Sequence, residues 1–481
     1  MSKLKAYLKK ENKSYKIKFG TDGWRAIIAR DFTVENVSRV GFGIANWLAE
    51  EVEPKVVIGF DTRFAGRLFA ESLAIVLLKK GVNVFLDPHF TTTPMVSYAT
   101  KKLNCNLGII FTASHNPPSY NGLKIKGGFG GPASDDTVNE IVDLIPDRIK
   151  MPSDEDFNQL DKNVNYKSVN LETLFYNNLI HRFNLSELSK HQKDFVFDAM
   201  NGSIQDFIRK LFPEMKMVRV DPDPTFKGTS PEPIEKNLLP LRMALKKGNY
   251  ELGLAVDGDA DRIGLMDRNG EVIDAHHIML ILIWYMKKYK GLSGKVVTGF
   301  SSTQKIKQLC KKLNLDLEIV KIGFKHAASI MLKEDVLVAG EEAGGIATKG
   351  HIPERDGLWN ILLIMEMLIE NNTTIETVLK EIADEVGEFG YQRADLHIER
   401  SKIDQVIDGL KKELPTAIGN RKIAFTETLD GFKFYFNDDE WLMVRASGTE
   451  PLLRVYAESE TLAKAEKLIG LGKKHFGLLL R

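Results

Sequence analysis

Val56-Val57-Ile58-Gly59-Phe60-Asp61 is an apolar run that ends in a carboxylate, and it predicts a buried strand. Residues 66–80 then show the apolar spacing of an amphipathic helix, and residues 82–86 predict a second strand. The same order of strand, helix and strand returns twice. The second copy spans 195–198, 204–211 and 217–220, and the third spans 296–299, 303–313 and 317–320. Three similar units predict three α/β domains, each with a mixed or parallel sheet flanked by helices.

The pattern changes after residue 387. Short strands are expected at 432–436, 441–445 and 453–457, followed by a helix at 462–475, which predicts an α+β domain. We therefore expect four domains, at 1–160, 161–270, 271–386 and 387–481, with linkers in 151–165, 267–274 and 385–390. The most apolar stretches, 278–286 and 358–369, fall short of the roughly 20 residues that cross a bilayer, so they predict buried helices.

Composition excludes several classes of protein. The chain has 481 residues with 43% hydrophobic content, enough to bury several cores. Lys and Arg total 66 against 65 for Asp and Glu, so no bulk charge attracts nucleic acid or an anionic membrane, and we expect neither partner. Two cysteines are too few for a disulfide framework, and the first residues lack the apolar run of a secretory signal. These features favour a cytoplasmic location.

A serine motif follows the strand expected at 107–111 and reads Thr112-Ala113-Ser114-His115-Asn116-Pro117. Its Asn-Pro part alone is typical of an ordinary turn. Its position, however, is the carboxyl end of a strand, where α/β sheets place ligands. A serine hydroxyl at its free pKa is a weak nucleophile, so chemistry at Ser114 needs a neighbouring base, a metal or prior phosphorylation. His115 and Lys124 are the nearby candidates.

Three carboxylates occupy alternate residues in Asp257-Gly258-Asp259-Ala260-Asp261-Arg262, directly after the strand expected at 251–256. The small residues between them let the loop curl, so that the oxygens can converge on a hard cation. The remaining ligands of an EF-hand are missing. Mg²⁺ prefers oxygen ligands and commonly binds substrate phosphates as well. We therefore expect Asp257, Asp259 and Asp261 to bind Mg²⁺, with Arg262 offsetting part of their charge.

Two further motifs supply groups that bind a phosphorylated sugar. Arg445-Ala446-Ser447-Gly448-Thr449-Glu450-Pro451 offers a guanidinium, hydroxyls and backbone amides around a glycine, which suit a phosphate, and Arg454 adds a second guanidinium. Gly340-Glu341-Glu342-Ala343-Gly344-Gly345 places carboxylates in a glycine-rich loop, where they would accept hydrogen bonds from sugar hydroxyls. Each motif alone is also typical of a simple glycine turn. Their joint occurrence at strand ends indicates one site.

Three other functions compete with this interpretation. A Rossmann dehydrogenase is suggested by Gly41-Phe42-Gly43, but no third glycine follows and residues 32–50 have helical character. A phosphatase that uses an aspartate nucleophile from 257–262 would leave the serine and arginine motifs without a role. A sugar-phosphate sensor without catalysis would be favoured only if a catalytic part were missing.

The chain resembles the α-D-phosphohexomutase family nearly from end to end, from Phe19-Gly20-Thr21-Asp22-Gly23-Trp24-Arg25 to the loop at Arg445. In that family four domains surround a central cleft, and each contributes one loop. The resemblance implies that Ser114 carries a phosphoryl group and that its phosphate joins Asp257, Asp259 and Asp261 in binding Mg²⁺. Arg25 and Lys124, the latter in Asn121-Gly122-Leu123-Lys124, match positions near the reacting groups, and Lys124 is the expected general base.

The sugar loop resembles the phosphoglucomutase form of the family, with Ala343 where that form usually has serine. Gly323-Phe324-Lys325 and the segment 351–357 also resemble glucose-type enzymes, which makes Lys325 and Arg355 expected ligand contacts. The implied reaction interconverts glucose 1-phosphate and glucose 6-phosphate through phosphoserine and glucose 1,6-bisphosphate. The Arg445 loop would hold the phosphate that does not react. A phosphomannomutase or dual-specificity enzyme is the alternative, and a phosphoglucosamine mutase is the weaker one. The expected partners are phosphorylated hexoses, and the expected assembly is a monomer or a homodimer.

Overall fold

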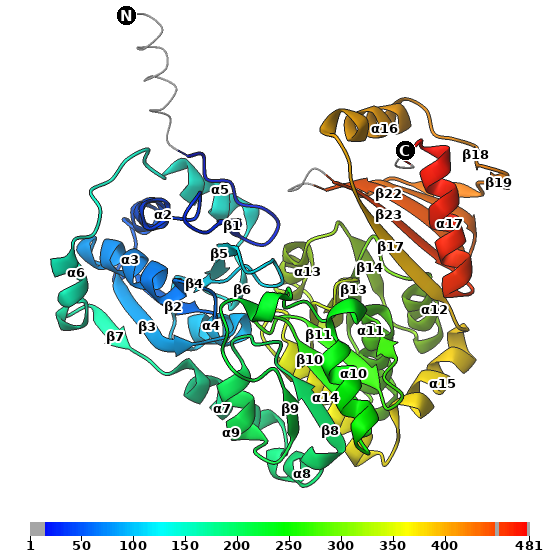
Figure 1. Cartoon of the computed structure of the whole chain (residues 1–481), viewed down its shortest axis with the longest axis horizontal. Coiled ribbons are helices and arrows are strands. Elements are labelled where there is room, and N and C mark those ends of the chain that lie inside the picture. The colour runs from blue at the N-terminus through cyan, green and yellow to red at the C-terminus, as the bar shows by residue number, and fades with distance from the viewer. Residues whose placement is uncertain (1–14, 448–451, 479–481) are drawn as a thin grey trace, which may run out of the picture. The chain divides into compact units, whose positions relative to one another are not determined.

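The computed structural model describes residues 15–447 and 452–478, which fall into two compact units. The first unit holds the chain as far as Val272 together with Ile352–Leu362. The second holds Ile273–His351 together with the chain from Leu363 onward. Figure 1 labels their sheets and helices. No helix within the described residues is long and apolar enough to cross a membrane.

The first sheet is mixed and has seven strands, in the order β1-β5-β4-β2-β3-β7 with β6 paired to β5. Its centre is parallel, because β2 pairs in parallel with β3 and β4, whereas β5 runs antiparallel to β4. The strands are β1 (Trp24–Ile27), β2 (Lys55–Phe60), β3 (Asn83–Phe90), β4 (Leu107–Phe111), β5 (Tyr120–Gly127), β6 (Gly131–Pro132) and β7 (Tyr166–Ser168). The helices are α2 (Val34–Trp47), α3 (Gly66–Lys79), α4 (Thr93–Lys102), α5 (Asp135–Asp143) and α6 (Asp154–Asn158).

The second sheet has the order β12-β11-β10-β8-β9, and the third has β14-β13-β15-β16. Their strands are β8 (Phe195–Asp198), β9 (Lys216–Val218), β10 (Leu252–Val256), β11 (Ile263–Asp267), β12 (Val272–Ile273), β13 (Lys295–Gly299), β14 (Leu317–Val320), β15 (Val336–Gly340) and β16 (Ile346–Thr348). The helices in this part of the chain are α7 (Leu171–Arg182), α8 (Leu185–Lys190), α9 (Gln205–Leu211), α10 (Leu239–Lys247), α11 (Ala275–Trp284), α12 (Gln304–Leu313), α13 (Phe324–Met331), α14 (Gly357–Glu370) and α15 (Ile375–Val386).

These three sheets share one topology. In each, the first strand of the repeat lies between the second and the third, which are parallel to it, and a fourth strand runs antiparallel beside the third. The loop between the third and fourth strands therefore occupies the same place in every repeat. That loop is 112–119 in the first sheet, 257–262 in the second and 341–345 in the third. The serine motif, the three aspartates and the proposed sugar loop thus lie in equivalent positions.

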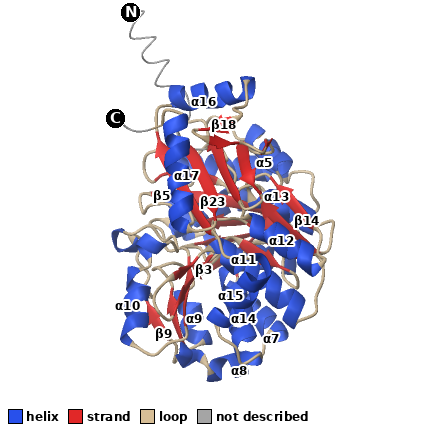
Figure 2. Ribbon diagram, turned by 90° about the vertical axis from the view of Figure 1, so that its right-hand side faces the viewer, coloured by secondary structure: helices blue, strands red, loops and turns tan. Residues whose placement is uncertain are grey.

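The fourth sheet is antiparallel, in the order β17-β23-β22-β21-β20. Helix α17 lies along this sheet in Figure 2 and contacts β17, β22 and β23. The elements are β17 (Gly390–His397), α16 (Arg400–Lys412), β20 (Phe425–Glu427), β21 (Phe432–Asn437), β22 (Glu440–Ala446), β23 (Leu452–Ser459) and α17 (Leu462–His475), with a separate pair β18 (Ala417–Ile418) and β19 (Arg421–Lys422).

Local chemistry explains why the first domain packs tightly. Strand β4 is buried along its whole length, as its continuous apolar sequence requires. Gly108 in this strand lets α4 approach, because a Cβ there would stand 2.0 Å from Thr100 Oγ1. Helix α4 begins at an N-cap, Thr92, whose hydroxyl accepts from the amide of Met95 at 3.3 Å.

The expected fold class is confirmed: three α/β domains with mixed sheets precede an antiparallel C-terminal domain. The stretch 278–286 lies in α11 and the π-helical turn Tyr285–Tyr289 that follows it, the stretch 358–369 lies in α14, and both are buried as expected. The predicted linker at 151–165 differs, because a serine N-cap and a capping box at Ser153 start the short helix α6 inside it. The four domain boundaries stay predictions.

Candidate active site

The loop after β4 presents Ser114 in an unusual backbone conformation. Ser114 has a φ of 50°, in the left-handed region that residues other than glycine seldom adopt. Its amide donates to Thr112 Oγ1 at 2.8 Å, and its side chain is fully buried. The Ser114 hydroxyl donates to Asp257 Oδ2 at 2.7 Å and lies 3.2 Å from His115 Nδ1. The serine and the carboxylate loop, 143 residues apart in sequence, are therefore in direct contact.

Arg63 holds this serine loop in place. Its guanidinium donates to four backbone carbonyls, those of Ser114 at 2.6 Å, Asn116 at 2.7 Å, and Pro117 and Tyr120 at 2.9 Å each. The side chain is fully buried, and Arg63 Nε lies 3.3 Å from a carboxylate oxygen of Asp61. The sequence reasoning missed Arg63, although a signal existed. Residues 61–63 follow the carboxyl end of β2, which is the parallel neighbour of β4.

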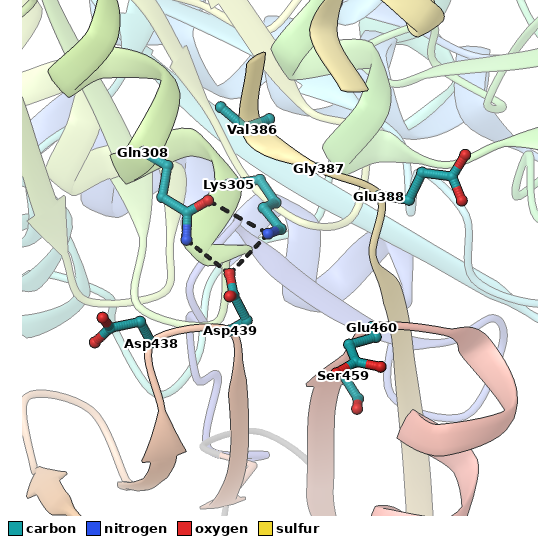
Figure 3. A pocket seen from close by; sticks show the side chains of 9 residues that line it. All are labelled: Lys305, Gln308, Val386, Gly387, Glu388, Asp438, Asp439, Ser459 and Glu460. Atoms are coloured by element: carbon teal, nitrogen blue, oxygen red, sulfur yellow. Dashed lines mark hydrogen bonds and ion pairs between the residues drawn. The ribbon is translucent and has the colours of Figure 1, made fainter. Parts of the chain in front are cut away.

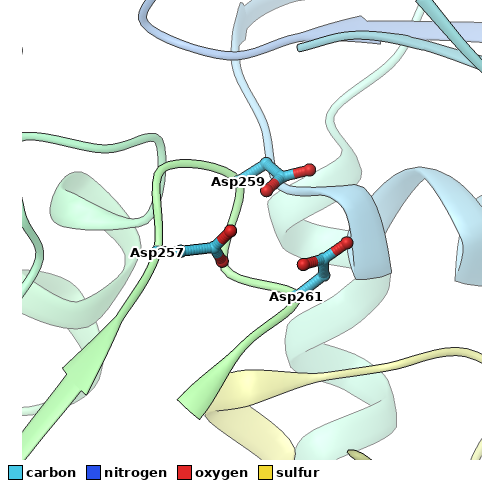
Figure 4. Close-up of side chains that lie close together, drawn as sticks. All are labelled: Asp257, Asp259 and Asp261. Atoms are coloured by element: carbon cyan, nitrogen blue, oxygen red, sulfur yellow. The ribbon is translucent and has the colours of Figure 1, made fainter. Parts of the chain in front are cut away.

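The three carboxylates after β10 converge as the sequence suggested. Asp257, Asp259 and Asp261 are fully buried, and one oxygen of each lies within 4.8 Å of the others (Figure 4). Gly258 allows this loop to approach the serine loop, because a Cβ at that position would stand 2.8 Å from the carbonyl oxygen of Ser114. Ala260 completes the curl with a φ of 58°.

These residues fit a divalent cation. Within the described chain no donor reaches Asp259 Oδ1 or Asp261 Oδ1, although both oxygens are buried. Such acceptors are costly unless a cation or donor satisfies them. Burial raises the pKa of Asp257 well above its usual range, and the charges of Asp259 and Asp261 raise it further. Ionising all three carboxylates at once is therefore unfavourable in this buried site, and a hard cation such as Mg²⁺ would offset their negative charge.

Lys124, on β5, contacts two of these three carboxylates and also Asp22. Its ammonium lies 2.8 Å from Asp259, 2.7 Å from Asp261 and 3.0 Å from Asp22. Burial lowers the pKa of Lys124, but the three carboxylates outweigh that effect and raise it above its usual value. In this arrangement Lys124 is therefore protonated. It can serve as a base only after these ion pairs are released.

Three arginines surround this centre. Arg25 donates to Asn116 Oδ1 at 2.7 Å and to Asp22 at 2.9 Å, and thereby joins the serine loop to the first strand. Arg355 donates to Asp261 at 2.8 Å and to Asp22 at 3.0 Å. The backbone amide of Arg262 donates to Asp257 at 3.0 Å.

Arg355 was expected to contact the ligand, and that expectation stays a prediction. It lies in the segment 352–362, which belongs to the first unit together with the aspartates. Asp22 connects Arg25, Arg355 and Lys124, although the sequence analysis named Asp22 without assigning it a role.

His115 is an uncharged neighbour of the serine. Burial lowers the pKa of His115 well below its usual value, and the positive charges of Arg262 and Arg25 lower it further. A neutral imidazole can donate or accept a hydrogen bond with the serine hydroxyl without adding charge to the site.

The second unit carries the expected sugar loop. Glu341 directly follows β15, and its Oε1 accepts from the amide of Gly323 at 2.9 Å. A turn then brings Gly345 back, because the amide of Glu341 donates to its carbonyl at 3.1 Å. Ala343 lies within this turn, and Lys325 lies in the first turn of α13 beside Gly323. The predicted sugar-loop residues and Lys325 therefore come from neighbouring parts of one domain.

The second unit also carries the predicted phosphate loop. Arg445 and Arg454 stand opposite each other on the paired strands β22 and β23. Arg445 Nε donates to Asp430 at 3.0 Å, while Arg454 lies 3.8 Å from Asp395. Ser447 closes the strand ends, because its amide donates to the carbonyl of Leu452 at 2.9 Å. Gly448 and Thr449, also predicted in this loop, lie outside the described residues.

Comparisons with known proteins cover most of the chain. Four family profiles match in sequence order, described as phosphoglucomutase/phosphomannomutase alpha/beta/alpha domain I at residues 16–150, domain II at 173–270, domain III at 274–386 and the C-terminal domain at 399–469. A phosphoglucomutase/phosphomannomutase of Thermococcus kodakarensis is 28% identical, over 95% of this chain and 97% of that protein. A phosphoglucosamine mutase of Limosilactobacillus reuteri is 30% identical, over 92% and 94%. A solved structure of a Thermus thermophilus protein assigned as a phosphomannomutase superimposes with a TM-score of 0.83 at 29% identity, over 96% of this chain and 99% of that one.

Proposed function

The chain belongs to the phosphoglucomutase/phosphomannomutase family, and from that premise we propose that it interconverts glucose 1-phosphate and glucose 6-phosphate through a phosphorylated Ser114. The observation that carries this proposal is the hydrogen bond of 2.7 Å between the Ser114 hydroxyl and Asp257. It joins a buried serine to a buried set of carboxylates that suits a divalent cation. A serine at such a centre is suited to carry a phosphoryl group.

Asp257, Asp259 and Asp261 would hold Mg²⁺ together with the phosphate on Ser114. When bound, Mg²⁺ supplies charge stabilisation to the transferring phosphoryl group. Arg262 and Arg25 lie close enough to His115, the neighbour of the serine, to affect its charge, and they add positive charge from the protein. The serine loop, held by Arg63, fixes the direction in which Ser114 presents its oxygen.

The transfer breaks the bond between phosphorus and Ser114 Oγ and forms a bond between phosphorus and a sugar hydroxyl oxygen. The proton of that hydroxyl must leave at the same time. We assign its removal to Lys124, which can accept that proton once it has released Asp259 and Asp261 and has given up its own proton. The second half of the reaction reverses these events at the other phosphate of glucose 1,6-bisphosphate, so Ser114 recovers its phosphoryl group and the product leaves.

Arg445, Arg454 and Ser447 would bind the phosphate that does not react. The two guanidinium groups stand on facing strands, which gives a phosphate two donors at one surface. Glu341 would accept hydrogen bonds from sugar hydroxyls. Arg355 and Lys325 remain proposed ligand contacts, and Arg25 remains a proposed catalytic residue near the reacting groups.

A phosphoglucosamine mutase is the second candidate, and one observation favours it. Glu342 Oε2 in the sugar loop is buried, and among the described residues no donor satisfies it. The ammonium group of a glucosamine phosphate would suit this oxygen better than a hydroxyl does. The relative from Limosilactobacillus reuteri carries that activity in its name.

The test is coupled turnover of glucose, mannose and glucosamine 1-phosphates with Mg²⁺ and trace glucose 1,6-bisphosphate. Fastest conversion of the glucose ester is expected. Comparable mannose activity would make the enzyme dual, and a preference for the glucosamine ester would replace glucose as the assigned substrate. Ser114→Ala should abolish turnover, while Ser119→Ala, an exposed serine of the same loop, should retain it. Full turnover by Ser114→Ala would exclude the phosphoserine mechanism.

A further inference from the structure

Asp430 connects the two substrate-binding loops of the second unit. It lies in the turn between β20 and β21, next to Gly431. Gly431 has a φ of 100°, and a Cβ there would stand 2.6 Å from the carbonyl oxygen of Val444, so only glycine lets this turn approach the end of β22. One oxygen of Asp430 accepts from Arg445 Nε at 3.0 Å, and the other accepts from the amide of Ile322 at 2.8 Å.

The next amide along the chain continues the connection. Gly323, which follows Ile322, donates its amide to Glu341 Oε1 at 2.9 Å. Gly323 has a φ of 131°, a value that glycine adopts readily and other residues do not. Two consecutive amides therefore hold two carboxylates. One carboxylate belongs to the sugar loop, and the other fixes the arginine of the phosphate loop.

We propose that Asp430 is a positioning residue for the mutase reaction, which fixes Arg445 relative to Glu341 through the amides of Ile322 and Gly323. The inference rests on the proposed function, in which Arg445 binds the phosphate and Glu341 binds the sugar hydroxyls. A bisphosphate that reacts at either end must meet the same spacing between these two groups in both orientations. Asp430 touches neither the phosphate nor the sugar, and it acts through Arg445.

The alternative explanation is that Asp430 only links two domains and does not position the substrate-binding residues. Asp439 serves as the control for this alternative. Asp439 also lies in the C-terminal domain and also reaches the preceding domain, where it accepts from Lys305 at 2.7 Å and from Gln308 at 2.8 Å (Figure 3). None of the predicted substrate residues that the structure describes lines the pocket around it. Asp439→Asn thus weakens a link between the same two domains without disturbing either loop.

The variants are Asp430→Ala, which removes both hydrogen bonds, and Asp430→Asn, which leaves one acceptor oxygen and turns an NH₂ group toward the other donor. Hydrogen bonds to charged groups of this kind correspond to about ten- to a hundredfold in an equilibrium or rate ratio. We expect Asp430→Ala to lower kcat/KM by about that factor for each hexose 1-phosphate that the wild type converts. Asp430→Asn should show a smaller loss, and Asp439→Asn should stay within about twofold of the wild type. Asp430→Asn serves as the folding control if the alanine variant has a lowered Tm.

Two measurements distinguish a positioning role of Asp430 from a purely structural one. Combined with Arg445→Ala, Asp430→Ala should cost little more than Arg445→Ala alone, because its effect passes through that arginine. In a Ser114→Ala background, which removes turnover, calorimetry with glucose 6-phosphate and with inorganic phosphate should show weaker binding for Asp430→Ala than for Asp439→Asn. Equal values for these two variants, or fully additive losses with Arg445→Ala, would overturn the inference. A wild type that converts no hexose phosphate would refute the proposed function instead, and the binding comparison would still decide the role of Asp430.

Discussion

Replacing Arg63 by lysine tests how the serine loop is held. The guanidinium reaches three carbonyl oxygens of the loop and that of Tyr120, the first residue of β5, at 2.6 to 2.9 Å. Lysine keeps the charge beside Asp61, but it has one nitrogen in place of a planar fork, so it cannot reach all four oxygens. A net hydrogen bond to a charged group contributes about 1.5–3 kcal/mol. If lysine loses two such bonds and relaxation offsets part of the loss, the loop conformation seen in the structure is destabilised by about 3 kcal/mol relative to an open loop.

Such a cost raises the open population of the loop by about a hundredfold, because each 1.4 kcal/mol is about a factor of ten. Hydrogen exchange measured by mass spectrometry on peptides covering 112–120 should therefore show a large loss of protection in Arg63→Lys. The turnover number should fall as well, because Ser114 no longer keeps its left-handed backbone. Arg67→Lys is the matched control, since the Arg67 side chain is 65% exposed and its ion pair within the described part of the chain is with Glu71. If both variants exchanged equally at 112–120, the account of Arg63 would be wrong.

Three further perturbations follow from the same geometry. Gly258→Ala should reduce turnover at least tenfold with a smaller change in the free energy of unfolding, because the new Cβ meets the Ser114 carbonyl at 2.8 Å; wild-type kinetics would contradict the close approach. Thr93→Val removes a hydrogen bond of 2.6 Å to Asp259 and should raise the Mg²⁺ concentration for half-maximal activity by about ten- to a hundredfold, which a metal titration would measure. Burial lowers the pKa of Lys433 to about 7, against 10.5 for a free lysine, so between these values the unfolded chain binds more protons and stability rises with pH. Urea midpoints between pH 7 and 10 should show this rise in the wild type and a weaker one in Lys433→Met; identical slopes would exclude Lys433 as its source.

Most of the secondary structure and the aspartate loop could be predicted, because the sequence patterns that indicate them lie within single elements. The strand expected at 195–198 is β8, and the helix expected at 462–475 is α17, since apolar periodicity and caps act within one element. The aspartate loop was recognised because its three ligands fall on alternate residues of one turn. The roles of Arg63 and Asp430 could not be inferred in this way. Arg63 and the Ser114 carbonyl that it contacts are 51 residues apart in the sequence. Asp430 and the Ile322 amide that it accepts from are 108 residues apart.

The sequence by itself determined the order of the elements, the motifs at the strand ends and the family, because each depends on residues close together along the chain. Only the tertiary structure decided that Ser114 donates to Asp257, that Lys124 is held as an ammonium by Asp259 and Asp261, and that Arg355 pairs with Asp261. The physical reason is that charge and hydrogen bonding depend on distance in space. A carboxylate changes the pKa of a lysine only when folding brings both out of water and into contact.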